Sequence, residues 1–402
     1  MHIRRACFDP VSKGRPVSAL KGVRRIIMER EYCIMSKVNE SSISRRSLFQ
    51  VAAGAAVAAA AAGVAIETAA PEQALAAGKK KKEVKIAASD DPSYVIDATG
   101  KQVMVPEKIE RVVITCQGGT THEAVIFGGA DKIVAEPSMK RFPQLLRMFP
   151  ELNDVTDGGS FDDINIETIA ATAPDIALCG VSSDKGNAQI EEIGIPVYVM
   201  LIGWAGVESL KQEFLNVSHL FGNDERGQEL VDYWDEKLGL IAERVAALPE
   251  EERAKTVYYI SKPDITKANT GDWGRNWLDA CGVTFAVPEE DLNGDITAEK
   301  AIGWDPDYIV IQGGNGDVSE LLNEPTVQDM KAIQSGEVHI CPIGGFWWDR
   351  PSAEAPLAFL WLAQITHPGY FDDIDLEQET VDFFKRFYNY DLPQEEYESF
   401  FA

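Results

Sequence analysis

The chain has 402 residues, of which 45% are hydrophobic and 25% charged, proportions typical of a globular protein with a sizeable core. The formal charge is −26, but residues 1–77 hold 11 basic and 6 acidic residues, so the remainder carries −31. Such an acidic body excludes nucleic-acid binding as the main function, because phosphates are bound through Lys and Arg. The length alone allows two to three domains.

Residues 1–77 form a targeting segment and are predicted to lie outside the fold. The stretch SRRSLFQ, with Arg45 and Arg46, is typical of a twin-arginine export signal. An apolar run rich in Ala follows over residues 51–66, and an A-x-A cleavage site ends at Ala76. The sequence therefore predicts export, to the periplasm or the cell envelope.

Two features of this segment leave alternatives open. The apolar run is short for a membrane span, but an uncleaved signal would act as an anchor. Met35 is a more usual start for such a signal, so residues 1–34 are interpreted as an over-extended start. Residues 78–92, which include four consecutive Lys, are predicted to be a solvated tether.

The exported body contains four widely spaced cysteines without a C-x-x-C motif, which indicates neither a zinc site nor a disulfide framework. Cys116 and Cys179 both end apolar runs in the first half, so they are candidates for neighbours. The favoured interpretation is that these two are ordinary buried thiols, and the disulfide state of the four, which include Cys281 and Cys341, stays open.

Residues 93–222 are predicted to form an N-terminal α/β lobe. Alternating apolar residues around Ala98-Thr99-Gly100 predict a hairpin. Short apolar runs then alternate with amphipathic segments, a pattern typical of a parallel sheet covered by helices. The predicted strands are RVVIT, KIVAE, DIALCG and IPVYVML, and the predicted helices are THEAVIFGGA, IETIAATAP and NAQIEEIG.

Residues 223–249 predict one long helix, and residues 250–402 a second α/β lobe. Apolar residues recur at helical spacing from Leu230 to Val245, and Leu248-Pro249 ends the pattern. In the second lobe the predicted strands are KTVYYIS, DYIVIQGG and VHICPI, with helices ending at WLDACG, over TAEKAIGW and from Ser352 through Ile365. The fold class is therefore two Rossmann-like lobes joined by a rigid helix, with a ligand cleft between them.

One pattern occurs in both lobes, 132 residues apart. Glu167 and Glu299 are each followed seven residues later by Pro-Asp, then by an apolar run that ends in Gly. Proline ends a helix because it cannot occupy an interior turn. We interpret the repetition as duplication or pseudo-symmetry, with coincidence as the alternative, since helix, Pro-Asp and strand make a common crossover.

From about residue 94 to 396 the chain resembles the substrate-binding proteins of ABC importers for iron chelates and corrinoids. The resemblance rests on DATGKQVMVPEKIERVVI, NIETIAATAPDIAL, TAEKAIGWDPDYIVI, HPGYFDDIDL and FFKRFYNYDL, in this order. It implies two lobes, a helical hinge, one ligand in the cleft, and docking of a monomer onto a permease dimer. It also implies that Glu167 and its counterpart Glu299 pair with Arg on the permease.

The ligand residues are predicted from the loops that follow the carboxyl ends of the strands, where open α/β sheets bind ligands. Indole rings offer stacking area for a bulky chelate, and Arg beside a helix N-terminus suits an anion. Trp234 and Trp361 lie at helical core spacing and are assigned to the core, while the orientation of Trp348 stays open. The predicted ligand residues are Gln117, His122, Met139 and Trp204 in the first lobe, and Trp273, Arg275, Trp347 and Arg350 in the second.

No metal ligand set and no cofactor are predicted. His122 lacks a second His four residues later, and His339 and His367 lie in other segments, so any metal would arrive inside its chelator. The predicted function is delivery of an iron chelate of the ferric siderophore type, with corrinoid, haem and molybdate also open. The alternatives are an exported redox enzyme, although no G-x-G-x-x-G or C-x-x-C-H is present, and a scaffold with a degenerate cleft.

Overall fold

The computed structural model describes residues 84–117 and 119–401, without the side chain of Trp204. The predicted export signal with Arg45, Arg46 and Ala76 therefore lies outside the described residues. The described part begins with the hairpin that the sequence predicts, formed by β1 (Tyr94–Ile96) and β2 (Gln102–Met104). No helix of the described residues is long and apolar enough to cross a membrane.

The N-terminal lobe is built on a five-stranded parallel sheet with the strand order β5-β4-β3-β8-β9. Every residue of β3, β8 and β9 is buried, as expected for a sheet covered on both faces. The strands are β3 (Val112–Ile114), β4 (Ile133–Glu136), β5 (Thr156–Asp157), β8 (Ile176–Gly180) and β9 (Val197–Met200). The helices are α3 (Gly119–Ile126), α4 (Pro143–Met148), α5 (Ile166–Ala171) and α6 (Asp184–Glu192), and β6 (Gly159–Ser160) pairs with β7 (Asp163–Ile164).

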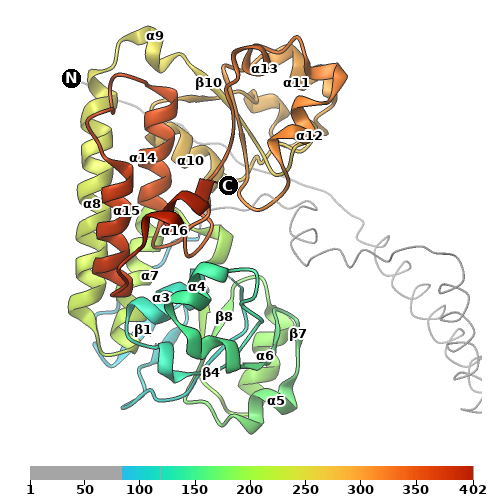
Figure 1. Ribbon diagram of the computed structural model, residues 1–402. Coiled ribbons are helices and arrows are strands. Elements are labelled where there is room, and N and C mark those ends of the chain that lie inside the picture. The colour runs from blue at the N-terminus through green and yellow to red at the C-terminus, as the bar shows by residue number, and fades with distance from the viewer. Residues whose placement is uncertain (1–83, 118, 402) are drawn as a thin grey trace, which may run out of the picture. The chain divides into compact units, whose positions relative to one another are not determined.

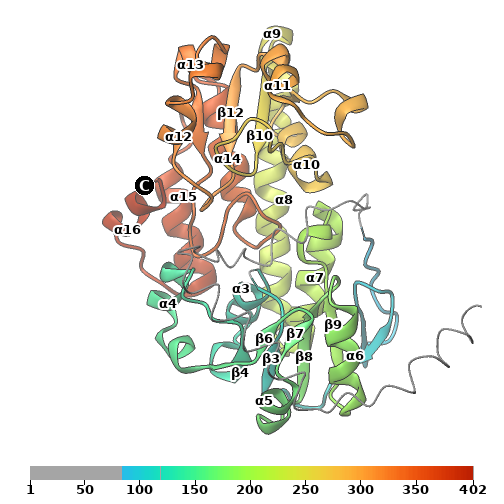
Figure 2. The same cartoon turned by 90° about the vertical axis from the view of Figure 1, so that its right-hand side faces the viewer.

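Two helices follow this sheet where the sequence shows a continuous helical pattern. They are α7 (Val207–Leu220) and α8 (Asp224–Ala247), and Gly222 between them has a φ of 68°. The 24 residues of α8 span about 36 Å at the α-helical rise. The two sheets lie toward opposite ends of α8 (Figures 1 and 2), which confirms the predicted long connecting helix.

The C-terminal lobe has a four-stranded parallel sheet in the order β11-β10-β12-β13. Alternate residues of its strands contribute to two apolar clusters: Val257 and Tyr259 join the large core, whereas Tyr258 and Ile260 face the other side. The strands are β10 (Thr256–Ile260), β11 (Thr284–Phe285), β12 (Tyr308–Ile311) and β13 (Val338–Ile340). The helices around it are α9 (Glu250–Arg253), α10 (Asp272–Ala280), α11 (Ala298–Trp304), α12 (Val318–Leu322) and α13 (Lys331–Ser335).

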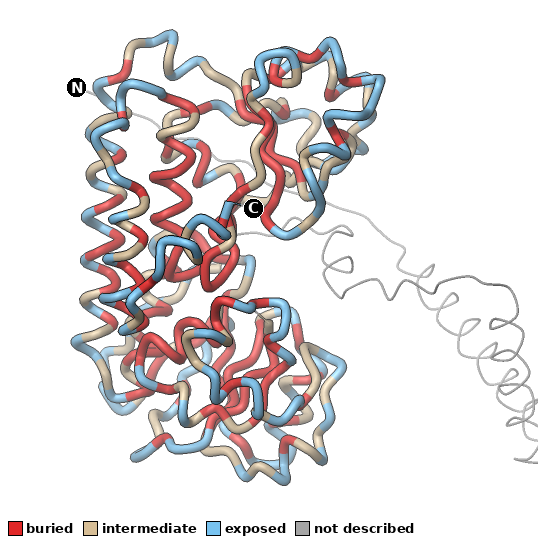
Figure 3. The backbone as a smooth tube through the Cα atoms, in the orientation of Figure 1, coloured by how far each residue is buried: buried red, intermediate tan, exposed pale blue. Residues whose placement is uncertain are grey.

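The C-terminal helices follow, and the first of them packs along α8. These are α14 (Ala355–Thr366), α15 (Leu376–Phe383), the π-helix η7 (Phe384–Tyr388) and α16 (Gln394–Glu398). Almost every residue of α14 is buried, and α8 turns its buried face toward it (Figure 3). The helix predicted from Ser352 begins only at Ala355, a correction that matters for the site below. All described residues belong to one compact unit, so the predicted lobe boundaries stay predictions.

Candidate functional site

The loop between β13 and α14 is organised by one buried carboxyl group, that of Glu354. Its oxygens accept hydrogen bonds from the backbone N–H of Gly345 (3.1 Å) and of Phe346 (3.2 Å), from Trp348 Nε1 (3.0 Å) and from the Tyr388 hydroxyl (2.6 Å). Burial raises the pKa of Glu354 to about 7, although all four donors lower it. Four donors to one side chain hold the loop in one conformation and turn the indole of Trp348 inward.

Asp349 fixes the far end of the same loop. Its carboxylate accepts hydrogen bonds from the Tyr259 hydroxyl (3.0 Å), the Gly313 N–H (2.9 Å) and Arg350 Nη1 (2.7 Å). The carbonyl of Asp349 accepts a further bond from Trp273 Nε1 at 3.2 Å. Burial is the largest influence on the pKa of Asp349 and raises it. The guanidinium group of Arg350 is therefore held by a carboxylate that Tyr259 and Gly313 also bond.

Trp347 lies where the two lobes meet, and the guanidinium groups of two arginines lie near its ring. The Arg141 guanidinium carbon is 4.4 Å from its ring centroid, and that of Arg350 is 5.1 Å away. Arg141 Nη1 also donates to Gln117 Oε1 at 2.9 Å. The structure thus brings together three predicted residues, Gln117, Trp347 and Arg350, and adds Arg141 after β4, which the sequence analysis missed. Two cations beside one π face form a cation–π arrangement suited to an anion.

His122 and Met139 occupy packed positions in this structure. His122 is fully buried, and its Nε2 lies 2.6 Å from the carbonyl oxygen of Gly345, which it can only reach as a donor. Its ring is 4.9 Å from that of Phe346 and 5.7 Å from that of Phe142. Met139 is 3% exposed. A ligand would contact these two side chains only if the lobes moved apart.

Trp273 and Arg275 were predicted in a ligand loop but lie in the first turn of α10, where their surroundings differ. Trp273 is 7% exposed and packs against Trp234 and Phe359 at 6.5 and 6.2 Å between centroids, so it supports the Asp349 loop from the core side. Arg275 pairs with Asp272 in the turn before it. The core positions of Trp234 and Trp361 are confirmed, since both are buried.

The repeated pattern is also a repeat in three dimensions. Glu167 and Glu299 are both exposed in the first turns of α5 and α11. Each helix is capped by the preceding side chain: Asn165 accepts the N–H three residues on at 3.0 Å, and Thr297 does the same at 3.4 Å. The pKa of Glu299 is lowered by its own backbone N–H and then by the Thr297 side chain.

Both copies end in the same way. Ala173 and Asp305, each directly before the proline, adopt left-handed backbone with φ of 44° and 41°. The carboxylate of Asp175 then accepts the N–H groups at the start of β3 (2.7 and 2.9 Å), and that of Asp307 accepts the N–H at the start of β10 (2.7 Å). Left-handed conformation is uncommon outside glycine, so its recurrence at matched positions favours pseudo-symmetry over coincidence.

All four described cysteines are free thiols and buried, which confirms the prediction for Cys116 and Cys179. Burial raises the pKa of Cys179 to about 12, which keeps this thiol protonated and unreactive at neutral pH. Among the described residues, no group of three or more His, Cys, Asp or Glu is arranged to hold a metal ion.

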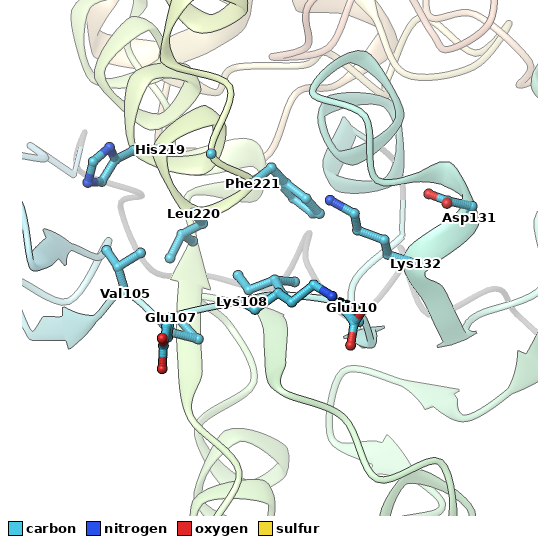
Figure 4. A pocket seen from close by; sticks show the side chains of 12 residues that line it. Val105, Glu107, Lys108, Glu110, Asp131, Lys132, His219, Leu220 and Phe221 are labelled. Atoms are coloured by element: carbon cyan, nitrogen blue, oxygen red, sulfur yellow. Dashed lines mark hydrogen bonds and ion pairs between the residues drawn. The ribbon is translucent and has the colours of Figure 1, made fainter.

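Two cavities lie in the N-terminal lobe, away from the Trp347 group. One of about 450 Å³ is lined by residues 105–110 and 219–222 with Asp131 and Lys132 (Figure 4), and one of about 540 Å³ lies beside residues 88–95. They share His219, whose ring nitrogens lie 2.8 Å from an Asp224 oxygen and 2.7 Å from the Pro92 carbonyl. Neither cavity is lined by a predicted ligand residue.

Two parallel sheets bridged by a long helix, with charged and aromatic side chains meeting between them, define a two-lobed solute-binding protein. Comparison with known proteins agrees: residues 113–343 match the periplasmic binding protein family, and the chain belongs to this family. It is accordingly a solute-binding component of an ABC importer and not an enzyme, which decides against the exported redox enzyme.

Similarity to known proteins extends over most of the chain. The chain is 24% identical over 320 residues to the molybdate-binding protein MolA of Haemophilus influenzae, covering 73% of this chain and 90% of MolA. A periplasmic solute-binding protein of Veillonella parvula has a similar structure, with a TM-score of 0.67, 23% identity, and 77% and 96% of the two chains covered. The structure of Helicobacter pylori CeuE with Ni(II) bound gives a TM-score of 0.62 at 18% identity, covering 77% and 99%. These similarities support the fold and leave the ligand open.

Proposed function

We propose that the protein captures an anionic iron chelate of the ferric siderophore type and delivers it to an ABC importer. The observation that supports this is the meeting of Arg141 from one lobe and Arg350 from the other at the ring of Trp347. In a body that carries −31, two guanidinium groups at one point between the lobes favour a negatively charged ligand. Trp347 is 6% exposed in this structure, so its indole offers a flat surface for stacking a bulky chelate once the lobes move apart.

Molybdate is the second candidate, because MolA, a relative over most of the chain, is named for binding it. A small oxyanion uses hydrogen-bond donors and charge and gains little from an aromatic surface. The two ligands therefore make different demands on Trp347, while both need the arginines.

The first experiment is native mass spectrometry with an absorption spectrum of the protein purified from its own host. A catecholate band supports the proposal, whereas a haem or corrinoid band overturns it. Titration calorimetry with ferric tris(2,3-dihydroxybenzoate) and with molybdate then separates the two candidates. We expect Trp347→Ala to weaken binding of the ferric probe by about tenfold or more. Binding of molybdate, if present, should stay nearly unchanged.

The arginines are tested with a matched control. Arg141→Gln and Arg350→Gln should each weaken binding of the ferric probe by about tenfold or more, because each removes one charge-assisted contact. Arg253→Gln, which removes an exposed charge from α9, should leave binding unchanged. Equal effects of all three substitutions would mean that only net charge matters and would overturn a site at Trp347.

We also propose that Glu167 and Glu299 dock the two lobes onto the permease dimer. Their matched, exposed positions suit a two-fold partner that carries Arg. The double substitution Glu167→Lys with Glu299→Lys should abolish uptake and leave ligand affinity intact. The control is Glu192→Lys with Glu243→Lys, which makes the same charge change on exposed positions of α6 and α8. Loss of ligand affinity in the first variant would contradict the docking role.

A further inference from the structure

Three strand ends of the N-terminal lobe meet around Gly180, the last residue of β8. A Cβ atom there would lie 3.3 Å from Cys116 after β3, from Ile202 after β9 and from Phe161. No side chain fits at this position without displacing one of these neighbours. The loop with Gln117 and the loop with Trp204 therefore share one packed base, so a shift in either loop is transmitted to the other.

The loop after β9 is held in a strained conformation. Ile202 has a φ of 48°, in the left-handed region that β-branched residues rarely adopt. Strain of this kind persists only where the surroundings fix the backbone, and it is concentrated at functional positions. The residue before it, Leu201, is fully buried, and its N–H donates to Glu213 Oε2 at 2.7 Å. This bond ties the end of β9 to the second turn of α7, twelve residues further along the chain.

Glu213 has a second buried carboxyl group near it. It is 2% exposed and interacts electrostatically with Glu123 of α3, also 2% exposed, whose Oε2 has no hydrogen-bond partner. Burial and the charge of Glu213 both raise the pKa of Glu123, so the two carboxyl groups do not both ionise at neutral pH and the pair holds a proton. The titratable groups that interact electrostatically with the pair include Cys116, Tyr198 and Tyr388.

We propose that Glu213 and Glu123 are positioning residues for the N-terminal half of the ligand site. Glu213 holds the strained backbone that carries Trp204, and Glu123 lies on the helix that follows the Gln117 loop. Both side chains are buried, so they set the geometry of these loops without forming part of the ligand surface, and their helices α3 and α7 contact each other (Figure 2). The inference rests on the proposed function, since it assigns both loops to the ligand.

The test compares Glu213→Leu with Glu213→Gln in the full-length protein. An amide oxygen still accepts the Leu201 N–H, whereas leucine cannot, so Glu213→Leu should speed hydrogen exchange in residues 201–205 and weaken binding by about fivefold or more. Glu213→Gln should restore both. The probe is ferric tris(2,3-dihydroxybenzoate) or molybdate, whichever the wild type binds. Asp97→Asn, a buried carboxyl of the same lobe in the β1–β2 turn, controls for lost stability and should leave the dissociation constant unchanged.

The pH profile provides a second readout. Burial raises the pKa of Glu213 to about 8, so binding by the wild type should weaken as the pH rises past this value and Glu213 becomes charged beside Glu123. Glu123→Gln removes the repulsion and should flatten this part of the profile. This variant also tests the inference if Glu213→Leu does not fold.

Three outcomes would overturn the inference: wild-type exchange and affinity in Glu213→Leu, an equal loss of affinity in Asp97→Asn, or an unchanged pH profile in Glu123→Gln. A wild type that binds neither probe overturns the proposed function instead. In that case, unchanged exchange at residues 201–205 in Glu213→Leu still refutes the positioning role.

Discussion

Glu136, the last residue of β4, makes the stability of the N-terminal lobe depend on pH. Its side chain is buried, Oε2 accepts a hydrogen bond from the Thr121 hydroxyl at 2.8 Å, and Oε1 has no partner. Burial raises the pKa of Glu136 from its ordinary 4.5 to about 7, against a smaller lowering by Thr121. The folded protein therefore binds a proton here more tightly than the unfolded chain does.

The direction and size of the effect follow from these two pKa values. The stabilisation by the neutral carboxyl is complete below pH 4.5 and is lost as the pH rises through 7. The full shift corresponds to about 3.4 kcal/mol, of which about 2.5 kcal/mol falls between pH 5 and pH 8. Glu136→Gln keeps an oxygen for Thr121 and cannot ionise. The variant should therefore gain about 2.5 kcal/mol on the wild type between these two pH values.

The assay is urea denaturation of wild type and variant at a series of pH values, with the difference in unfolding free energy plotted against pH. Glu151→Gln, which replaces an exposed carboxyl of the same lobe, should give a difference within about 0.5 kcal/mol throughout. Parallel stability curves for wild type and Glu136→Gln, within the same margin, would refute the assignment of a buried neutral carboxyl at this position.

Three further predictions concern the packing and the helix ends. Asn165→Ala and Thr297→Ala should each lower the unfolding free energy by about 1 kcal/mol, with the smaller loss at Thr297, whose cap bond is longer. If denaturation showed a negligible loss of unfolding free energy for both variants, these side chains would not stabilise the helices as caps. Gly345→Ala should lower the free energy of unfolding by about 1–3 kcal/mol, since the added Cβ would lie 2.7 Å from a Glu354 oxygen. Gly239→Ala, in open space on α8, should raise this free energy by up to about 1 kcal/mol. The four buried thiols of the described region should react with Ellman's reagent only after unfolding, and reaction in the native state would place them nearer the surface.

Hydrophobic periodicity was sufficient to predict α8 and the longer strands of both sheets, because α8 is long and those strands are largely buried. It did not predict the two-residue edge strands β5 and β11, which are not buried. It failed at the start of α14. Ser352 is a common N-cap residue, yet Glu354 is used by the preceding loop, and the helix starts at Ala355 with Pro356 in its first turn. α15 and α16 also escaped prediction, since their buried faces are determined by packing against distant segments.

The candidate site was less accessible to sequence reasoning than the fold. The rule that ligand loops follow the carboxyl ends of strands led to Gln117, Trp347 and Arg350, which the structure groups together. The same rule selected Trp273, which packs against Trp234 and Phe359 and not beside the arginines, because a tryptophan near a ligand site and one in the core can have the same local sequence. Arg141 was missed although it directly follows a selected loop, since its stacking on Trp347 is a contact 206 residues away in the chain.

The two acidic residues of the repeated pattern have different roles, and a pair of substitutions separates them. Asp175 binds two N–H groups at the start of β3, so Asp175→Asn should cost about 1–2 kcal/mol of unfolding free energy and leave uptake per folded molecule unchanged. Glu167 makes no ion pair within the part of the chain that the structure describes, and α5 lies at the end of the lobe remote from α3 (Figures 1 and 2). Glu167→Gln should therefore change stability by less than about 0.5 kcal/mol and still reduce uptake. If uptake fell with Asp175→Asn and not with Glu167→Gln, the repetition would serve folding alone, because a first-turn glutamate favoured by the helix dipole would then need no partner.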